Sequence, residues 1–413
     1  MTYANIILPL PLEGLFTYGV PDALASRVQV GVRVRVPLGK SKTYVGIVAE
    51  YPVALPASDS GVVDNEKKIV YKDILEVLDA TPILLPQQLR LWRWISDYYM
   101  SPIGDVYKAA LPSGLKAEDG YRPRTELYVR LADNFRNERS LTLMIDAMKR
   151  ASKQVEVLMA YLRLAGVDKV EHLTTETPLR EVTREELMND THTTIGVIRA
   201  LTDRKLLVTY EKEVGRLNDN VLPHPEHIKP LNEAQTEAYN QILIQMMCHP
   251  VTLLHGVTSS GKTEIYIHLI QKAIDEHKQV LYLLPEIALT VQITERLKAV
   301  FGNRLGIYHS KYSDAERVEI WQKQLSAQPY DVILGARSAV FLPFQRLGLV
   351  IIDEEHEQSF KQQDPAPRYH ARSAAIVLAQ MYAGAKTLLG TATPSMETYY
   401  NAQQGKYGLV ELT

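Results

Sequence analysis

Apolar residues in the last part of the chain, from Leu231 onward, recur in short runs that alternate with amphipathic stretches. The runs are rich in Leu, Ile and Val, which is typical of strands buried on both faces. They are VTLLHG (251–256), KQVLYLLP (278–285), RLGIYH (304–309), YDVILGA (330–336), LGLVIIDEE (347–355) and AKTLLGTA (385–392). Helical patterns such as ALTVQITERLKAVF (288–301) separate them. This β–α alternation predicts a parallel sheet covered by helices on both faces.

The first part of the chain, residues 1–109, has shorter β-branched runs that are broken by Pro and Gly. They are NIILPL (5–10), VRVRVPL (32–38) and YVGIVAEY (44–51), and they predict a small β-rich domain. Alternation in the second run places Arg33 and Arg35 on one strand face. The segment 54–68 is polar and predicts a loop. Apolar residues at helical spacing follow this loop, and we expect them to pack in the core. They are Leu85, Leu89, Trp92, Ile95 and Tyr99.

The middle part, residues 110–215, is mainly helical in pattern. QVEVLMAYLRLA (154–165) predicts an amphipathic helix, and Thr183 with Glu186 forms a capping-box pattern at the start of another. The next helix has Ile195, Ile198 and Leu201 on one face, and LLVTYEKEV (206–214) predicts a strand after it. Helix, turn, helix, strand is the outline of a winged helix, although a generic helical packing module has the same outline. Residues 216–230 carry three prolines and predict an interdomain linker.

Composition sets limits on the class of protein. The chain has 413 residues, 46% of them hydrophobic, so two or three domains are expected. The start lacks a basic segment, no apolar run is long enough to span a membrane, and we expect a cytoplasmic protein without a secretory signal. A single cysteine, Cys248, excludes an internal disulfide and a cysteine zinc cluster, and no histidines stand at metal-ligand spacing, so no zinc site is expected. The net charge of −2 means that any nucleic-acid binding must come from specific sites.

The segment GVTSSGKT fits the pattern of a nucleotide phosphate loop, G-x-x-x-x-G-K-[ST]. It follows an apolar strand pattern and precedes a helical one, which is the context that the motif requires. Lys262 is predicted to reach the β- and γ-phosphates of ATP, and the Thr263 hydroxyl to bind Mg²⁺. The alternative is a chance glycine-rich turn. The predicted ATP-binding residues are Gly256, Val257, Thr258, Ser259, Ser260, Gly261, Lys262 and Thr263.

Acidic residues end one of the buried strand patterns downstream of this loop. Asp353 stands at the strand tip and is predicted to hold Mg²⁺, and Glu354 to position or deprotonate the attacking water. A solvated acidic cluster is the alternative reading. GTATPS (390–395) follows the next strand, and its hydroxyls are candidates for coupling the nucleotide state to a neighbouring lobe. Gln235, ahead of the first strand, is a candidate for contacting the adenine edge.

The acids and GTATPS together resemble a superfamily-2 helicase, and further motifs narrow the resemblance. LLPEIALT (283–290), GARSAVFLPF (335–344), DEEHE (353–357) and SFKQQDPAPRYHAR (359–372) are similar to the bacterial primosomal protein N-prime family, the PriA replication-restart helicases. LPLPLEGLFTYGVP, GVRVRVPLGK and YYMSPIGDV agree, so the resemblance covers nearly the whole chain. It implies an α/β multidomain protein with a 3′-DNA-end-binding domain, a winged-helix domain and, over 231–413, the first RecA-like helicase lobe.

The resemblance also implies DNA-binding residues. The positions that match the family's pocket for the 3′ end of a nascent strand are Phe16, Thr17, Gly39 and Lys72. The family usually has Asp at the position of Thr17, and Thr accepts a hydrogen bond from a terminal 3′-OH less strongly. An aromatic-rich loop is implied to bind single-stranded DNA, unless it is an ordinary surface loop. Its candidate residues are Phe360, Lys361, Arg368, Tyr369, His370 and Arg372.

The implied function is an ATP- and Mg²⁺-dependent 3′→5′ DNA helicase that recognises stalled forks and initiates primosome assembly. Implied partners are branched and single-stranded DNA, primosome proteins and single-strand-binding protein, for a monomer in the bacterial nucleoid. The family's second helicase lobe, with its arginine finger, and its zinc module have no counterpart in the sequence, so we expect the chain alone to bind nucleotide weakly and DNA without unwinding. The family commonly has Gly where Ser259 stands, and we expect binding to survive this change. Two alternatives are an ATP-independent fork-recognition and partner-docking module and a restriction-type translocase.

Overall fold

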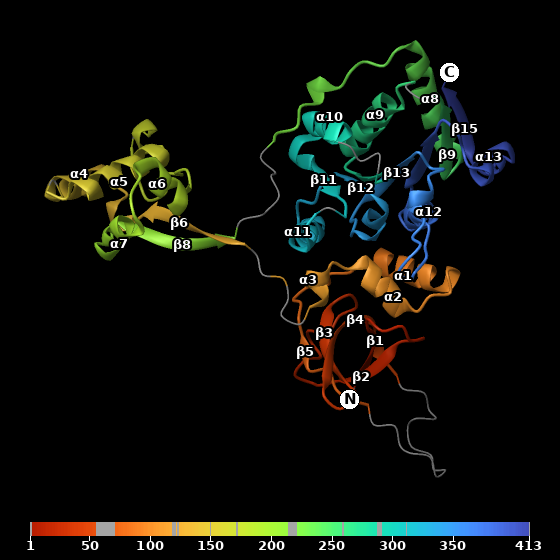
Figure 1. Cartoon of the computed structure of the whole chain (residues 1–413), viewed down its shortest axis with the longest axis horizontal. Helices are drawn as coiled ribbons and strands as arrows, with labels where there is room; N and C mark the ends of the chain where they lie inside the picture. The colour runs from red at the N-terminus through yellow and green to blue at the C-terminus, as the bar shows by residue number, and fades with distance from the viewer. Residues whose placement is uncertain are drawn as a thin grey trace, which may run out of the picture. The chain divides into compact units, whose positions relative to one another are not determined.

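The chain forms two compact units (Figure 1). Unit 1 comprises Met1–Tyr121 and Leu217–Thr413, and unit 2 comprises Arg122–Arg216. The computed structural model describes residues 2–54, 71–117, 121, 124–148, 150–170, 172–213, 221–257, 260–286, 291–310 and 312–412. None of the helices described over these ranges is long and apolar enough to cross a membrane.

A seven-stranded parallel sheet forms the C-terminal lobe of unit 1, in the order β11-β12-β10-β13-β14-β9-β15. All six predicted runs are strands of this sheet, and the seventh strand, β15, pairs with β9 at an edge that the sequence analysis did not predict. The strands are β9 (Val251–Gly256), β10 (Gln279–Leu283), β11 (Leu305–Tyr308), β12 (Val332–Gly335), β13 (Leu347–Asp353), β14 (Lys386–Thr391) and β15 (Gly408–Leu412).

Helices cover both faces of this sheet, as predicted. Neighbouring strand residues alternate between two cores: Leu388 lies in one with α8, α9 and α10, and Leu389 in the other with α11, α12 and α13. The helices are α8 (Glu233–Cys248), α9 (Lys262–Asp275), α10 (Val291–Phe301), α11 (Asp314–Leu325), α12 (Ala371–Gln380) and α13 (Met396–Gln403). This arrangement is the RecA-like lobe that the resemblance implied.

A five-stranded antiparallel sheet begins unit 1, in the order β2-β1-β4-β3-β5. Val34 and Val36 are fully buried in the core of one face, and Arg33 and Arg35 alternate with them, as predicted. The strands are β1 (Thr2–Ile7), β2 (Phe16–Val20), β3 (Arg33–Leu38), β4 (Lys42–Val53) and β5 (Glu76–Val77). The sequence analysis did not predict β2, and all but the first residue of the predicted loop 54–68 lies outside the described residues.

Three helices connect this sheet to the parallel-sheet lobe. They are α1 (Pro86–Tyr98), α2 (Ile103–Ala110) and α3 (Ser113–Lys116). The predicted packing stripe is confirmed, because Leu89, Trp92 and Ile95 are buried in one core that contains Ile47 of β4 and Phe341 of the lobe.

Polar contacts reinforce this shared core. The buried Gln88 side chain donates Nε2–H to the Phe341 carbonyl at 2.7 Å, and Trp321 donates Nε1–H to the Ile83 carbonyl at 2.9 Å. The Ser113 backbone N–H donates to the Asp314 carboxylate at 2.7 Å, which fixes α3 against α11. Residues 110–121 therefore belong with the first part of the chain, and the expected domain boundary at 109/110 lies inside unit 1.

Unit 2 is a three-stranded antiparallel sheet, in the order β7-β6-β8, with four α-helices. The predicted helix 154–165 and strand 206–214 are present as α5 and β8. The elements are β6 (Thr125–Leu131), α4 (Glu138–Ala147), α5 (Ser152–Leu164), β7 (Val182–Thr183), α6 (Arg184–Thr191), α7 (Ile195–Asp203) and β8 (Leu207–Glu213).

Two details of unit 2 differ from the sequence prediction. Ile198 and Leu201 are buried, but Ile195 is 52% exposed because it is the first residue of α7 and lies at the edge of the core. Thr183 accepts the Glu186 backbone N–H at 3.0 Å, whereas the Glu186 carboxylate pairs with Arg180, so only one half of the predicted capping box forms.

The described part of the predicted linker, residues 221–230, is fixed against α10. The His224 N–H donates to the Val300 carbonyl at 2.8 Å, and Asn303 N–H donates to the Val221 carbonyl at 2.6 Å. A Cβ at Gly302 would lie 2.4 Å from the Leu222 backbone, so the two segments are in close contact. These ten residues are therefore part of the lobe and not a free connection.

Candidate functional site

The phosphate loop joins the end of β9 to the start of α9. Gly256 is the last residue of the strand and Lys262 the first of the helix. Gly261 has φ +83°, and a Cβ at this position would lie 2.1 Å from Nε2 of Gln235. Both the backbone conformation and the contact therefore require glycine. Thr258 and Ser259 lie outside the described residues.

Lys262 is folded back onto its own loop. Its side chain is buried, and Nζ donates to the carbonyls of Gly256 at 2.9 Å and Val257 at 3.2 Å. The buried Ser260 hydroxyl has no hydrogen-bond partner among the described residues. Thr263 follows Lys262 in the first turn of α9, where unpaired backbone N–H groups favour an anion. The donors needed to hold phosphate are thus gathered at one helix N-terminus.

Gln235 lies beside the phosphate loop, but its amide is engaged in local contacts. Its Oε1 accepts the Asn232 backbone N–H at 2.9 Å, which completes a capping box at the start of α8. Its Nε2 is 3.4 Å from the carbonyls of Ser260 and Gly261. The Gln235 side chain therefore connects the start of α8 to the phosphate loop, and its predicted contact with adenine stays a prediction.

Asp353 stands at the tip of β13 in a mostly buried position. Tyr266 donates its hydroxyl to Oδ1 at 3.0 Å, and the Tyr282 hydroxyl lies 3.4 Å from Oδ2. Burial raises the pKa of Asp353 to about 6, and the Tyr266 hydrogen bond and the nearby Lys262 charge oppose that rise. Burial also raises the pKa of both tyrosines well above 10, so they remain donors. A carboxylate held this way is suited to a divalent cation, which favours its ionised form.

Glycine at position 390 is required by this same cluster. Gly390 is the residue of β14 that pairs with Asp353, and a Cβ there would lie 1.8 Å from the Tyr266 hydroxyl. The first glycine of GTATPS therefore makes room for the tyrosine that binds Asp353. This is a packing reason for part of the motif.

Glu354 follows Asp353 in the left-handed region, with φ +50°. Its side chain is 36% exposed, so its carboxylate is accessible to water. The next histidine of the motif, His356, is 2.8 Å through Nδ1 from the Thr391 hydroxyl. A hydroxyl of GTATPS thus contacts the acidic motif directly, and the coupling to a neighbouring lobe stays a prediction.

Glu355, the third acid of the motif, is fully buried and receives several donors. Its Oε2 pairs with the Arg372 guanidinium and accepts the Thr398 hydroxyl at 3.0 Å, and its Oε1 accepts the Ser395 N–H at 2.7 Å. Arg372 was predicted to contact DNA, but in this structure its side chain is only 14% exposed and forms an ion pair with Glu355. Glu355 was not among the predicted site residues, although its place inside DEEH after a buried strand was a usable signal.

Two other predicted DNA-binding residues of the loop are aromatic side chains in the core. Phe360 and Tyr369 are each 1% exposed, and the Tyr369 ring packs edge-on against Phe341 with centroids 5.0 Å apart. Neither ring has a free face on which a base could stack in this conformation. The sequence pattern could not distinguish these buried rings from exposed ones.

The remaining predicted residues of the loop are closer to the surface. Arg368 is exposed, and the ammonium group of Lys361 lies 4.9 Å from the centre of the ring of Tyr99, the residue that follows α1. The His370 N–H donates to the Tyr99 hydroxyl at 3.1 Å. Burial lowers the pKa of His370 to about 4, and the charges of Arg372 and Lys361 add to the effect. The loop is therefore held by α1 of the N-terminal region.

The four candidates for 3′-end binding are only partly brought together. Lys72 donates its Nζ–H to the Gly39 carbonyl, so these two form one cluster at the turn between β3 and β4. Phe16 packs against the core of the face that contains Val34, and Thr17 alternates to the other face. The structure thus places the aromatic ring and the Thr17 hydroxyl on opposite sides of β2.

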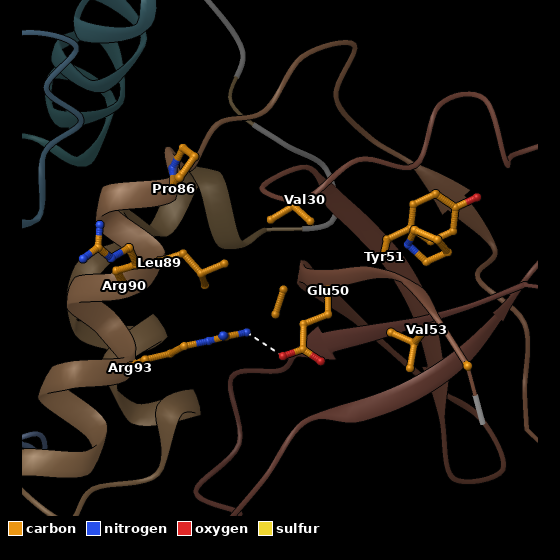
Figure 2. Close-up of a pocket in the computed structure, with 11 residues that line it drawn as sticks. Val30, Glu50, Tyr51, Val53, Pro86, Leu89, Arg90 and Arg93 are labelled. Carbon is orange, nitrogen blue, oxygen red and sulfur yellow. Dashed lines mark hydrogen bonds and ion pairs between the residues drawn. The ribbon is translucent and has the colours of Figure 1, made fainter. Parts of the chain in front are cut away.

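Thr17 begins a chain of polar contacts that leads to α1. Its hydroxyl donates to Asn5 Oδ1 at 2.7 Å, Asn5 Nδ2 donates to Glu50 at 2.7 Å, and Glu50 pairs with Arg93 at 2.7 Å. Figure 2 shows Arg93 reaching from α1 to Glu50 beside an open cavity of about 630 Å³. Sequence spacing could not predict this series of polar contacts, because its four residues come from four separate elements.

Comparisons with known proteins agree with the order of these parts. The model of a 3′ DNA-binding domain matches residues 5–112, that of a winged-helix domain of PriA helicases from Bacteroidota matches 126–214, and that of DEAD/DEAH box helicases matches 232–402. The replication restart protein PriA of Haemophilus influenzae is 36% identical over 414 residues, which cover 98% of this chain and 51% of that protein. The replication restart protein PriA of Chlamydia trachomatis is 34% identical over 418 residues, which cover 100% of this chain and 51% of that protein. The chain spans about half the length of these curated relatives.

Proposed function

Because the chain belongs to the PriA family of replication restart proteins, we propose that it is the DNA-recognition part and first motor lobe of an ATP-dependent DNA helicase. The whole protein unwinds DNA in the 3′→5′ direction, recognises stalled forks through a nascent 3′ end and initiates primosome assembly in the bacterial cytoplasm. Its partners are branched DNA, primosome proteins and single-strand-binding protein.

One observation carries the nucleotide part of this proposal. The phosphate loop and the acidic motif leave neighbouring parts of the sheet at the same edge, with only β14 between β9 and β13. Lys262 is close enough to Asp353 for its positive charge to oppose the rise in the pKa of that carboxyl that burial causes. A cation for phosphate and a carboxylate for Mg²⁺ thus share one site, which supports binding of Mg²⁺ and ATP.

The residues present fit this ligand. Gly261 leaves no room for a side chain, Ser260 has a buried hydroxyl without a described partner, and the N-terminus of α9 supplies backbone donors. We assign the phosphates to residues 256–263, with Lys262 released from its two carbonyls to reach them. Thr263 and Asp353 hold Mg²⁺, which supplies neutralisation of the charge that develops on the phosphates. Glu354 orients or deprotonates the attacking water.

The link from nucleotide to DNA runs through the buried Glu355–Arg372 pair. Glu355 follows the catalytic acids, and Arg372 follows the loop that contains Lys361 and Arg368. A change at the acids is therefore transmitted to the loop through an ion pair that the surrounding core keeps rigid. We assign contact with single-stranded DNA to the exposed cations of the loop, and not to its buried aromatic rings.

Recognition of a 3′ end is assigned to the Lys72–Gly39 cluster together with Thr17. Lys72 supplies a cation for sugar or phosphate, and Thr17 supplies a hydroxyl whose orientation is set by Asn5. A pocket for one terminal nucleotide needs no extended basic surface, which agrees with the net charge of −2.

The function is tested by ATP hydrolysis with and without single-stranded DNA. The chain tested alone is expected to hydrolyse ATP slowly and only when Lys262 is intact, because the described site supplies groups from one lobe. Addition of a second lobe from a relative should raise the DNA-stimulated rate by about 10³-fold or more, the value of a charge-neutralising arginine across the cleft. The same rate with Lys262→Ala would contradict the assignment.

A second candidate function is supported by the position of Lys262. Its ammonium group is bound by the Gly256 and Val257 carbonyls, so Lys262 already has partners within the protein, as a non-hydrolysing fork-recognition module would require. Binding of Mg²⁺ and ATP distinguishes the two. The module predicts tight binding to a 3′ end with no nucleotide affinity.

A further inference from the structure

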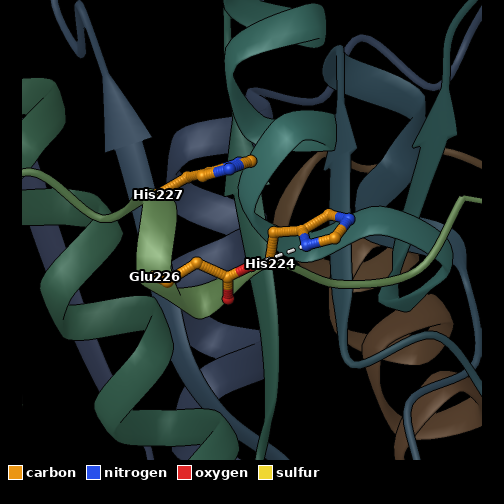
Figure 3. Close-up of side chains that lie close together, drawn as sticks. All are labelled: His224, Glu226 and His227. Carbon is orange, nitrogen blue, oxygen red and sulfur yellow. Dashed lines mark hydrogen bonds and ion pairs between the residues drawn. The ribbon is translucent and has the colours of Figure 1, made fainter.

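A cluster of metal-binding side chains lies on the segment that enters the parallel-sheet lobe. The sequence analysis found no histidines at metal-ligand spacing, but the structure brings together His224, Glu226 and His227 from the short run HPEH. One ligand atom from each lies within 4.8 Å of the others. Figure 3 shows the two imidazole rings and the Glu226 carboxylate projecting toward the same side of the segment.

The backbone of this run is held in place by the end of α10. The His224 N–H donates to the Val300 carbonyl at 2.8 Å, and the His227 N–H donates to the His224 carbonyl at 2.9 Å within the 3₁₀-turn η4 (Pro225–His227). The Pro225 ring restricts the backbone between the two histidines. The three side chains therefore start from fixed positions, which reduces the entropy that binding must overcome.

The tautomer of His227 is also fixed. Its Nδ1 lies 3.0 Å from the Ala299 carbonyl, which can only accept a hydrogen bond, so Nδ1 carries the proton. Nε2 is then left with its lone pair free to bind a metal. A histidine that donates its other ring N–H to a backbone carbonyl is the usual arrangement of a metal ligand.

The helix adds a favourable electrostatic environment. Ala299 and Val300 belong to the last turn of α10, whose carbonyl groups lack partners within the helix and carry its partial negative charge. A cation is stabilised at such a helix end. The carboxylate of Glu226, which already accepts a hydrogen bond from His224 Nδ1 at 2.7 Å, adds a full negative charge.

From these observations we propose that His224, Glu226 and His227 form a binding site for a divalent transition-metal cation of the Zn²⁺ class. Two imidazole nitrogens and one carboxylate oxygen suit this class and not Mg²⁺ or Ca²⁺, and water completes the coordination. Tetrahedral bonds of about 2.0–2.1 Å place ligand atoms roughly 3.3 Å apart. The ligand atoms now lie within 4.8 Å of one another, and exposed side chains adjust by small rotations. Binding through His224 Nδ1 releases to water the proton that this nitrogen now donates to Glu226.

The bound cation reinforces the junction between this segment and α10. Metal binding at Nε2 makes the Nδ1–H of His227 a stronger donor to the Ala299 carbonyl, and it fixes all three side chains on η4. The three ligands come from residues 224–227, and none of them is assigned above to the nucleotide or to DNA.

Zn²⁺ titration by isothermal calorimetry tests the site on the chelator-treated chain. The titration is made in a Cys248→Ser background, because the single exposed thiol of the chain is itself a zinc ligand. We expect one Zn²⁺ per chain. His224→Ala and Glu226→Gln should each weaken binding at least about tenfold, since even outer-shell partners of metal-binding histidines are worth 10–100-fold.

His224→Ala is the informative variant, because its backbone N–H still binds Val300 and the fold is retained. His172→Ala, an exposed histidine of unit 2, is the matched control and should leave the affinity unchanged. The thermal unfolding midpoint of the chain should rise with Zn²⁺ and lose that rise in His224→Ala. The proposal is overturned if the parent chain binds no Zn²⁺, or if the His224→Ala/His227→Ala double variant binds it with the same stoichiometry and affinity.

Discussion

The guanidinium of Arg372 is paired with the fully buried carboxylate of Glu355 and connects the acidic motif to the loop that precedes α12. Around this pair, Ser395 and Thr398 supply further hydrogen bonds to Glu355, so GTATPS, the acids and the loop form one network. The arrangement explains why motifs far apart in the sequence occur together in one lobe. It also identifies a side chain whose removal should affect both stability and coupling.

Arg372→Ala should destabilise the chain by about 3–5 kcal/mol, because it leaves Glu355 charged, buried and without its cation. Chemical denaturation of unit 1 measures this change. Arg93→Ala is the matched control, because Arg93 pairs with Glu50 where both side chains are more than 40% exposed, and such pairs contribute about 0–1 kcal/mol. Equal losses of unfolding free energy in Arg372→Ala and Arg93→Ala would contradict the conclusion that the Arg372–Glu355 pair is buried and the Arg93–Glu50 pair is exposed.

The elevated pKa of Asp353 predicts a pH-dependent cost to stability. The native carboxyl titrates at about 6 and the unfolded one at 3.8, so the native state binds more protons between these values, and stability falls as pH rises through this window. Asp353→Asn removes this cost. Its free energy of unfolding relative to the parent should increase by about 2 kcal/mol between pH 4 and pH 7 in the absence of Mg²⁺.

Urea denaturation at the two pH values checks this prediction. Asp97→Asn, at an exposed position on α1, serves as the control for removing a carboxylate away from the site. A parallel pH profile for Asp353→Asn and the parent would show that Asp353 is not desolvated in the native state.

Gln88 is predicted to hold the N-terminal region against the lobe. Its Oε1 accepts the Leu85 N–H at 2.7 Å and its Nε2 donates to the Phe341 carbonyl at 2.7 Å, so Gln88→Ala leaves two backbone groups without partners. We expect a loss of about 1–3 kcal/mol in the free energy of unfolding. Gln87→Ala, one position earlier on α1 where the side chain is only partly buried, should change it by less than Gln88→Ala does. A loss at position 87 as large as that at 88 would argue against the interdomain bond.

Lys72 is predicted to contribute to binding of a DNA 3′ end. Lys72→Ala should weaken binding of a short oligonucleotide with a 3′-OH about tenfold, the value of one charge-assisted hydrogen bond. Fluorescence anisotropy measures the affinity, with Lys406→Ala, an exposed lysine of the parallel-sheet lobe, as the control. The same titration compares ends with a 3′-OH and a 3′-phosphate, and equal affinities would exclude a pocket for the terminal nucleotide.

Much of the parallel-sheet lobe was predictable, because its strands are continuous apolar runs and its loops carry distinctive motifs. The edge strand β15 was missed because GLVEL is short and contains an acid, Glu411, unlike the continuous apolar runs of the other strands. The β-rich region was predictable in kind, but β2 carries Gly19 and two aromatic residues, which do not form a continuous β-branched run.

The candidate site was predictable in its motifs and not in the partners of each side chain. The pattern placed Asp353 at a strand tip, but nothing in the sequence connects it to Tyr266 on α9 and Tyr282 on β10. Interleaved aromatic and cationic residues in the loop predicted stacking on bases, whereas Phe360 and Tyr369 fill the core. Burial depends on which distant segments cover a residue, and here α1 and the segment around Phe341 supply that cover.

Nucleotide affinity tests the central claim that Lys262 and Asp353 form one site for Mg²⁺ and ATP. Binding of a fluorescent ATP analogue with Mg²⁺ is measured for the parent chain, Lys262→Ala and Lys272→Ala, an exposed lysine on the same helix. The account predicts saturable binding that is lost in Lys262→Ala and retained in Lys272→Ala. Equal affinity in all three proteins, or no binding to any of them, would contradict it.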